Sequence, residues 1–168
     1  MHTLYLLSVY LHITAAIVWI GGMFFLVLVL VPWLRKGDRA QAGRVMKEAG
    51  QRFRTIGWAC FGVVLVTGSF NLYVRGVRFS SFVDPQWLAS PFGRAVVYKL
   101  SFFALVLLLS AVHDFWHGPR ATLAVQKDPR SPEAERFRKQ ASHLGRLNML
   151  LALTLLGLGV ILVRGWPW

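Results

Sequence analysis

Long runs of apolar residues dominate this chain and set its expected architecture. The runs Leu4 to Trp33, Ile56 to Val74, Ala95 to Trp116 and Leu144 to Val163 are each close to, or above, the length of about 20 residues that a helix needs to cross a bilayer. The sequence therefore predicts an all-α integral membrane protein. We expect one four-helix bundle over residues 1–168, with helices at about 4–34, 56–75, 93–117 and 142–164.

Proline, glycine and polar residues mark the expected irregularities. Pro32, near the end of the first predicted helix, predicts a kink, and Gly118 with Pro119 predicts the end of the third helix. Residues 38–55 have a helix-favouring composition and should extend the second helix or lie at the membrane interface. Residues 76–94 mix aromatic residues with prolines, which predicts an ordered cap on the membrane surface.

The charge of the chain is concentrated in two of its connections. The formal net charge is +12, and the basic residues gather in residues 35–55 and 117–142, whereas residues 75–94 carry three arginines. By the positive-inside rule, the first and third loops are cytoplasmic and both termini lie outside, an N-out and C-out topology. Basic clusters beside spanning helices favour anionic lipid headgroups over nucleic acid. We therefore expect membrane lipid, and no nucleic acid, among the partners.

The remaining composition excludes several classes of function. The single cysteine, Cys60, excludes an intramolecular disulfide. The first apolar run has no basic residue before it and is too long for the core of a signal peptide, so it should be a spanning helix. The chain has no nucleophile triad, phosphate-binding glycine loop or paired carboxylates. Its function should then reside in the few polar side chains inside the spans.

Those polar side chains recur at helical spacing. Steps of three and four residues place one set on a single face of the third helix, and the other helices carry similar stripes that should meet in a polar line through the bundle. The third-helix stripe is Lys99, Phe103, Val106, Ser110, His113 and His117; its counterparts include His12, Ala16, Trp19 and Met23, then Cys60, Thr67 and Asn71, and finally His143, Arg146 and Thr154.

Histidines near the inner ends of the third and fourth helices form the first candidate site. His113 and His117 are four residues apart, a spacing that puts two imidazoles on one helix face, as a metal or haem iron would need. His143 opens the fourth helix at a similar expected depth, so three histidines could bind copper or zinc. Asp114 could hold a ligand imidazole through its other nitrogen. A pair from the two helices could instead bracket a haem, and the simplest alternative is that these histidines cap helices.

A second candidate group lies towards the outer face. His12 is about 12 Å inside the first helix, at a rise of 1.5 Å per residue, and an ionisable side chain at that depth is a functional candidate. Lys99 lies inside the third helix and either extends its amine to the membrane surface or binds an acidic group such as a haem propionate. Arg94 and Arg146 could bind the same acidic groups.

Three segments resemble the CopD family of copper resistance proteins. They are YLHITAAIVWIGGMFF at residues 10–25, VLVTGSFNLY at 64–73 and SPFGRAVVYKLSFFALVLLLSAVHDF at 90–115. The resemblance implies a multi-pass protein of the bacterial inner membrane that acts in copper transport or resistance. More distantly the chain resembles HemJ, a haem-binding protoporphyrinogen oxidase, whose histidine and lysine would correspond to His12 and Lys99. The outer face departs from a copper carrier, because it offers only Met1 and His2 as ligands.

Together these features predict a CopD-like membrane protein that binds a metal centre through His12, His113, His117 and His143 and serves copper transport or homeostasis. One alternative is a b-type haem protein, with Lys99, Arg94 or Arg146 on the propionates, that transfers electrons or oxidises a porphyrinogen. The other is a non-catalytic accessory subunit in a homo-oligomer or a larger membrane complex. The pattern leaves enzymatic activity undecided.

Overall fold

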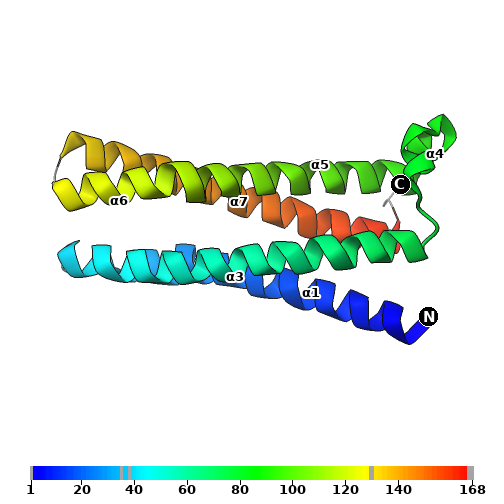
Figure 1. Ribbon diagram of the computed structural model, residues 1–168, viewed down its shortest axis with the longest axis horizontal. Coiled ribbons are helices and arrows are strands. Elements are labelled where there is room, and N and C mark those ends of the chain that lie inside the picture. Colours follow the sequence, from blue (N-terminus) through cyan, green and yellow to red (C-terminus); the bar gives the residue numbers. More distant parts are fainter. Residues whose placement is uncertain (1, 35, 38, 129–130, 166–168) are drawn as a thin grey trace. The chain divides into compact units, whose positions relative to one another are not determined.

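The computed structural model describes residues 2–34, 36–37, 39–128 and 131–165 (Figure 1). Within these residues there is no strand, so the predicted all-α class is confirmed. The elements are α1 (His2–Phe25), the π-helix η1 (Leu26–Leu30), α2 (Val31–Leu34), α3 (Arg39–Val74), the 3-10 helix η2 (Phe79–Val83), α4 (Pro85–Ala89), α5 (Pro91–Ala111), the π-helix η3 (Val112–His117), α6 (Gly118–Lys127) and α7 (Pro132–Arg164).

Four continuous stretches are long and apolar enough to cross a membrane, as the sequence predicted. They are His2–Leu34, Gln41–Val74, Pro91–Ala124 and Pro132–Arg164. Two of them begin more than ten residues before the apolar runs: α3 starts at Arg39, so residues 39–55 are the predicted extension of the second helix, and α7 starts at Pro132. Large apolar side chains such as Ile17, Val66 and Leu108 are more than half exposed, which is expected where lipid is the solvent.

The third spanning helix runs past the point where the sequence predicted its end. Gly118 and Pro119 were expected to stop it at residue 117, yet α6 continues directly from η3, so this boundary is corrected. Pro119 lies in the first turn of α6 and has no N–H to donate to the carbonyl four residues earlier, that of Phe115. The helix therefore extends on into the basic segment that was predicted to be a loop.

Both π-helical segments lie immediately before a proline. In η1 the Val31 N–H donates to the Leu26 carbonyl, and Pro32 follows; in η3 the Gly118 N–H donates to the His113 carbonyl, and Pro119 follows. A proline cannot donate to the carbonyl four residues before it, and its ring crowds that carbonyl. A widened turn keeps the helix continuous across this defect. The irregularity predicted at Pro32 thus takes the form of a π turn.

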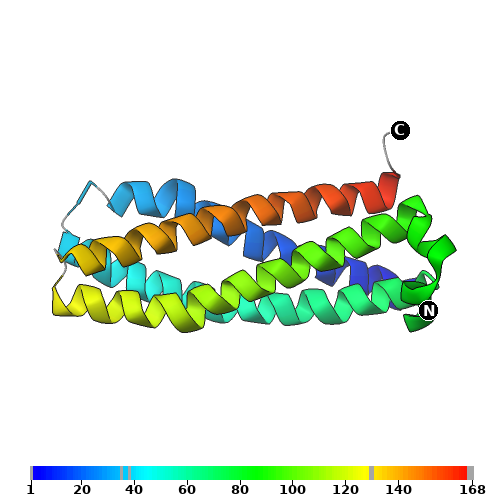
Figure 2. The same ribbon diagram turned by 90° about the horizontal axis from the view of Figure 1, so that it is seen from above.

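The chain divides into two compact units, Met1–Ser90 and Pro91–Trp168, and each contains one antiparallel pair of long helices. In the first unit α1 lies along α3, and in the second α5 and α6 lie along α7 (Figures 1 and 2). The assembly of the two units into a single four-helix bundle stays a prediction.

Glycine and aromatic residues bring α1 and α3 together. The Trp19 ring packs edge-on against Phe61, with centroids 4.9 Å apart, and lies 3.7 Å from the place a side chain at Gly57 would occupy. One turn further along α1, a Cβ at Gly22 would lie 2.7 Å from the Phe53 ring. Small residues of this kind allow close backbone approach, which is how helices associate where water supplies no hydrophobic driving force.

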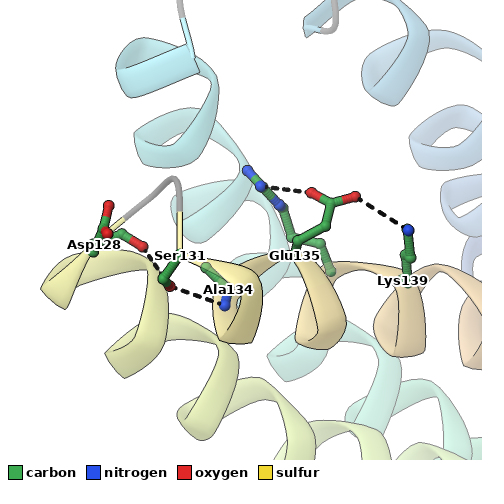
Figure 3. Close-up of polar contacts among 6 residues, drawn as sticks. Asp128, Ser131, Ala134, Glu135 and Lys139 are labelled. Carbon is green, nitrogen blue, oxygen red and sulfur yellow. Dashed lines mark hydrogen bonds and ion pairs between the residues drawn. The ribbon is translucent and has the colours of Figure 1, made fainter.

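Polar side chains stabilise the first turn of α7. At the start of α7, Ser131 Oγ accepts a hydrogen bond from the Ala134 N–H at 3.2 Å and donates to the Asp128 carbonyl at 2.8 Å (Figure 3). Glu135, in the first turn, bonds Arg138 at 2.7 Å. A serine cap and an acidic first turn are both favourable at the positive end of the helix dipole. The start of α7 is therefore defined by its own sequence.

The glycine contact in the first unit can be tested with neighbouring substitutions. Gly22→Ala should lower the stability of the folded protein by about 1–3 kcal/mol, because the new methyl group overlaps the Phe53 ring. Gly21→Ala is the matched control, since a Cβ there would have nothing within 4 Å. The measurement is thermal unfolding in detergent, and Phe53→Leu should restore the Gly22→Ala protein. Equal melting temperatures for the two alanine variants would contradict this packing.

Candidate functional site

His12 is held in the seam between α1 and α3. Its Nδ1 lies 2.9 Å from Oγ1 of Thr67, a residue only 7% exposed. One turn earlier on α1, the Ser8 hydroxyl donates to the main-chain carbonyl of the same threonine at 3.4 Å. Beside the same edge of the ring, a Cβ at Gly68 would lie 3.2 Å from His12 Cε1 and 3.6 Å from Nδ1. The Thr67 hydroxyl group thus holds the imidazole in place. Because Gly68 has no side chain, the ring can lie against the backbone of α3.

Two sulfur-containing side chains are buried further along the same helix pair. Met23 on α1 is 5% exposed and Cys60 on α3 is 8% exposed. Seven residues separate Cys60 from Thr67 and eleven separate Met23 from His12, which correspond to about 10 Å and 16 Å at 1.5 Å per residue. Because the helices are antiparallel, both sulfurs lie on the same side of His12 along the pair. Imidazole, thiol and thioether are the groups that soft metal ions such as Cu(I) prefer.

In the second unit, a carboxylate holds one of the predicted histidines. His113 Nδ1 lies 2.9 Å from Asp114 Oδ1 within η3, and the two side chains are 40% and 18% exposed. This is the contact between Asp114 and an imidazole that the sequence suggested. A carboxylate that bonds to one ring nitrogen orients the ring. It also increases the electron density that the other ring nitrogen can donate to a metal ion.

Two buried polar side-chain atoms in the second unit have no hydrogen-bond partner among the described residues. Asn148 Nδ2 on α7 donates to Ser110 Oγ on α5 at 3.1 Å, but Asn148 Oδ1 and His117 Nδ1 are both unsatisfied. Unsatisfied polar atoms are unfavourable in a protein interior, so water or a bound donor would stabilise this region.

The other predicted site residues are spread over the second unit. His143 and Arg146 on α7 and Arg94 on α5 are exposed. Lys99 is half-buried, and its Nζ lies 3.5 Å from the place a side chain at Gly159 would occupy. Over the described part of the chain, no group of three or more histidine, cysteine, aspartate or glutamate side chains could hold a metal ion. The histidines His113, His117 and His143 are thus not gathered into one cluster, and their roles as ligands stay predictions.

Sequence reasoning missed two features of the first unit. It placed Thr67 on a polar stripe but did not connect it with His12, and it did not identify Gly68 as the residue against which the ring lies. The signal was available in part, because Ser8 and His12 are four residues apart on one stripe and Thr67 lies on another. The missing information was how far α1 is shifted along α3, which only the structure provides.

Four membrane-length helices with polar side chains between them define a multi-pass membrane protein. The chain matches the family model of CopD, copper resistance protein D, over residues 47–163, and it belongs to the CopD family.

Two relatives extend this comparison. The chain is 32% identical over 162 residues to an uncharacterized protein of Aquifex aeolicus (strain VF5), a match that covers 95% of this chain and 96% of that protein. It is 31% identical over 111 residues to the copper transport protein CutJ of Bacillus subtilis (strain 168), covering 66% of this chain and 19% of CutJ. The chain therefore corresponds to a small part of CutJ. No solved structure matches it.

The hydrogen bond between α5 and α7 can be tested at Ser110. Ser110→Ala removes the acceptor of the Asn148 amide, whose oxygen is already unsatisfied, and should lower stability by about 0.6–1.7 kcal/mol, the range for hydrogen bonds between membrane helices. Ser101→Ala, at an exposed position of the same helix, is the control. Unfolding by titration with a denaturing detergent measures both. A midpoint of Ser110→Ala equal to that of Ser101→Ala would show that this bond does not stabilise the pair.

Proposed function

We propose that this protein handles copper in a bacterial inner membrane and binds the ion as its cargo at His12. Membership of the CopD family and similarity to a protein named as a copper transport protein support copper as the ion. The observation that carries the proposal is the His12 imidazole, an ionisable nitrogen ligand held by Thr67 inside a spanning helix. An ionisable group in such a position is expensive to keep, which favours a functional role.

The donor groups along α1 and α3 fit a soft ion in transit. His12 is followed by the buried sulfur atoms of Cys60 and Met23 in the same helix pair. An ion that is transported must bind strongly enough to enter and weakly enough to leave, so separate sites with few ligands serve transport better than one closed cage. In this proposal the copper path passes His12 and, further along the helix pair, the sulfur atoms of Cys60 and Met23.

His113 is the proposed ligand of the second unit, oriented by Asp114, with His117 in η3 and His143 on α7 as further candidates. The basic segments 39–55 and 118–139 flank the inner ends of the spans and support a cytoplasmic location for this region by the positive-inside rule. His12, near the opposite end of its span, then lies in the outer half of the membrane. This orientation assigns His12 to the entry side of copper from outside or to the exit side for export.

Binding of a b-type haem is the alternative use of the same polar groups. Its propionates would lie near Lys99, Arg94 or Arg146, and the histidines of η3 and α7 would hold the iron. Lys99 supports this alternative in part, because its amine reaches the backbone of α7 at Gly159 instead of extending along its own helix. A haem would supply electron transfer or porphyrinogen oxidation.

The proposal is tested by titrating the purified protein with Cu(I) against a competing chelator. His12→Gln should weaken binding by more than the roughly 10–100-fold that loss of an outer-shell partner causes at a metal site. His2→Gln, an exposed position on the same helix, is the matched control and should leave affinity unchanged.

Three results of this experiment would contradict copper binding at His12. Equal affinities of the His12→Gln and His2→Gln proteins would remove His12 from the site. A red preparation with a Soret band would identify the protein as a haem protein. A colourless wild-type protein with no affinity for Cu(I) would favour the accessory-subunit function.

A further inference from the structure

We infer that Thr67 fixes His12 in the tautomer that carries its proton on Nδ1 and its lone pair on Nε2. Thr67 is then a positioning residue, which acts on the candidate ligand without touching the metal. The importance of this tautomer for copper rests on the proposed function, whereas the tautomer itself does not.

The position of the Thr67 hydroxyl proton follows from the oxygen atoms around it. Thr67 Oγ1 lies 2.6 Å from the main-chain carbonyl oxygen of Val63, and a second carbonyl, that of Val64, is 3.4 Å away. A carbonyl oxygen has no hydrogen, and two oxygens approach to about 2.5–3.0 Å only when a hydrogen lies between them. The single hydroxyl proton of Thr67 therefore points at Val63.

With its proton committed to Val63, Thr67 Oγ1 can only accept from His12. The Nδ1–Oγ1 distance of 2.9 Å is that of a hydrogen bond, so the hydrogen must come from Nδ1. A neutral imidazole has one N–H, and the other ring nitrogen is then an acceptor. The lone pair of His12 consequently lies on Nε2.

The hydrogen bond to Thr67 excludes the flipped orientation of the ring. Rotating the imidazole by half a turn exchanges Nδ1 with Cδ2 and Cε1 with Nε2, and the carbon now facing Thr67 could not form the hydrogen bond. Gly68 lies beside the same edge of the ring, because a Cβ there would be 3.2 Å from Cε1 and 3.6 Å from Nδ1. Thr67 thus determines which edge of His12 faces α3, and the absence of a side chain at Gly68 leaves room for that edge.

This arrangement matches what a metal-binding histidine needs, with one difference. A ligating imidazole donates its second N–H to an acceptor that sets the tautomer, often a carboxylate. His113 has such a carboxylate in Asp114, but His12 has a neutral relay through a hydroxyl group to a main-chain carbonyl. Because burying an unpaired charge in a span is unfavourable, a neutral partner is the one compatible with the depth of His12.

The tautomer is read directly by nitrogen NMR of metal-free protein labelled with ¹⁵N-histidine, in alkaline buffer where the ring is neutral. The His12 signals are those absent from the His12→Gln spectrum. Wild type and Thr67→Ser should show a protonated Nδ1 and an unprotonated Nε2. Thr67→Val, which keeps the shape but removes the acceptor, should shift His12 towards the tautomer protonated on Nε2.

Thr154→Val is the matched control, because Thr154 also donates to the carbonyl four residues earlier, that of Leu150, but lies exposed on α7. It should leave the His12 signals unchanged. A wild-type His12 protonated on Nε2, or a Thr67→Val spectrum identical to wild type, would overturn the inference. The wild-type spectrum decides the tautomer by itself even if Thr67→Val does not fold.

Cu(I) affinity, measured on the same proteins, separates this inference from the proposed function. Thr67→Val should bind Cu(I) about 10–100-fold more weakly, the usual effect of losing an outer-shell partner, and Thr67→Ser should bind normally. A wild-type protein with the predicted tautomer and no Cu(I) affinity would refute the proposed function alone. A protein that binds Cu(I) while His12 is protonated on Nε2 would refute the role of Thr67 alone.

Discussion

A polar side chain inside a bilayer must find its hydrogen-bond partners within the protein, because the hydrocarbon offers none. In the first unit this constraint joins His12 to Thr67 and Ser8 to the main chain of α3. In the second it joins Asn148 to Ser110. The His12–Thr67 bond matters most, because it holds a titratable ring inside a span and fixes the orientation of that ring.

The fold was predictable from the sequence to the extent that bilayer thickness dictates it. Runs such as Leu4 to Trp33 are too long and too apolar for any other structure, and all four spans are present. The end of the third helix was not predictable in this way. Gly118 and Pro119 are stop signals for an α-helix, but the π turn η3 carries the chain past them.

The site was predictable only as far as its individual residues. Helical spacing identified His12 and Thr67 as members of polar stripes, but it contains no information on how far one helix is shifted along the other. The bond between Asn148 and Ser110 shows the same limit, because helical spacing does not say which residues of α5 and α7 lie opposite one another. The pairing of Asp114 with His113 was predictable because the two residues are adjacent in the chain.

X-ray absorption at the copper edge, on protein loaded with one equivalent of Cu(I), tests the binding of copper by His12 most directly. If His12 Nε2 is a ligand, the wild-type spectrum contains the multiple scattering of an imidazole ring, and the His12→Gln spectrum has one imidazole fewer around the copper. Identical spectra from the two proteins would show that copper is bound elsewhere and would contradict a role for the α1–α3 seam.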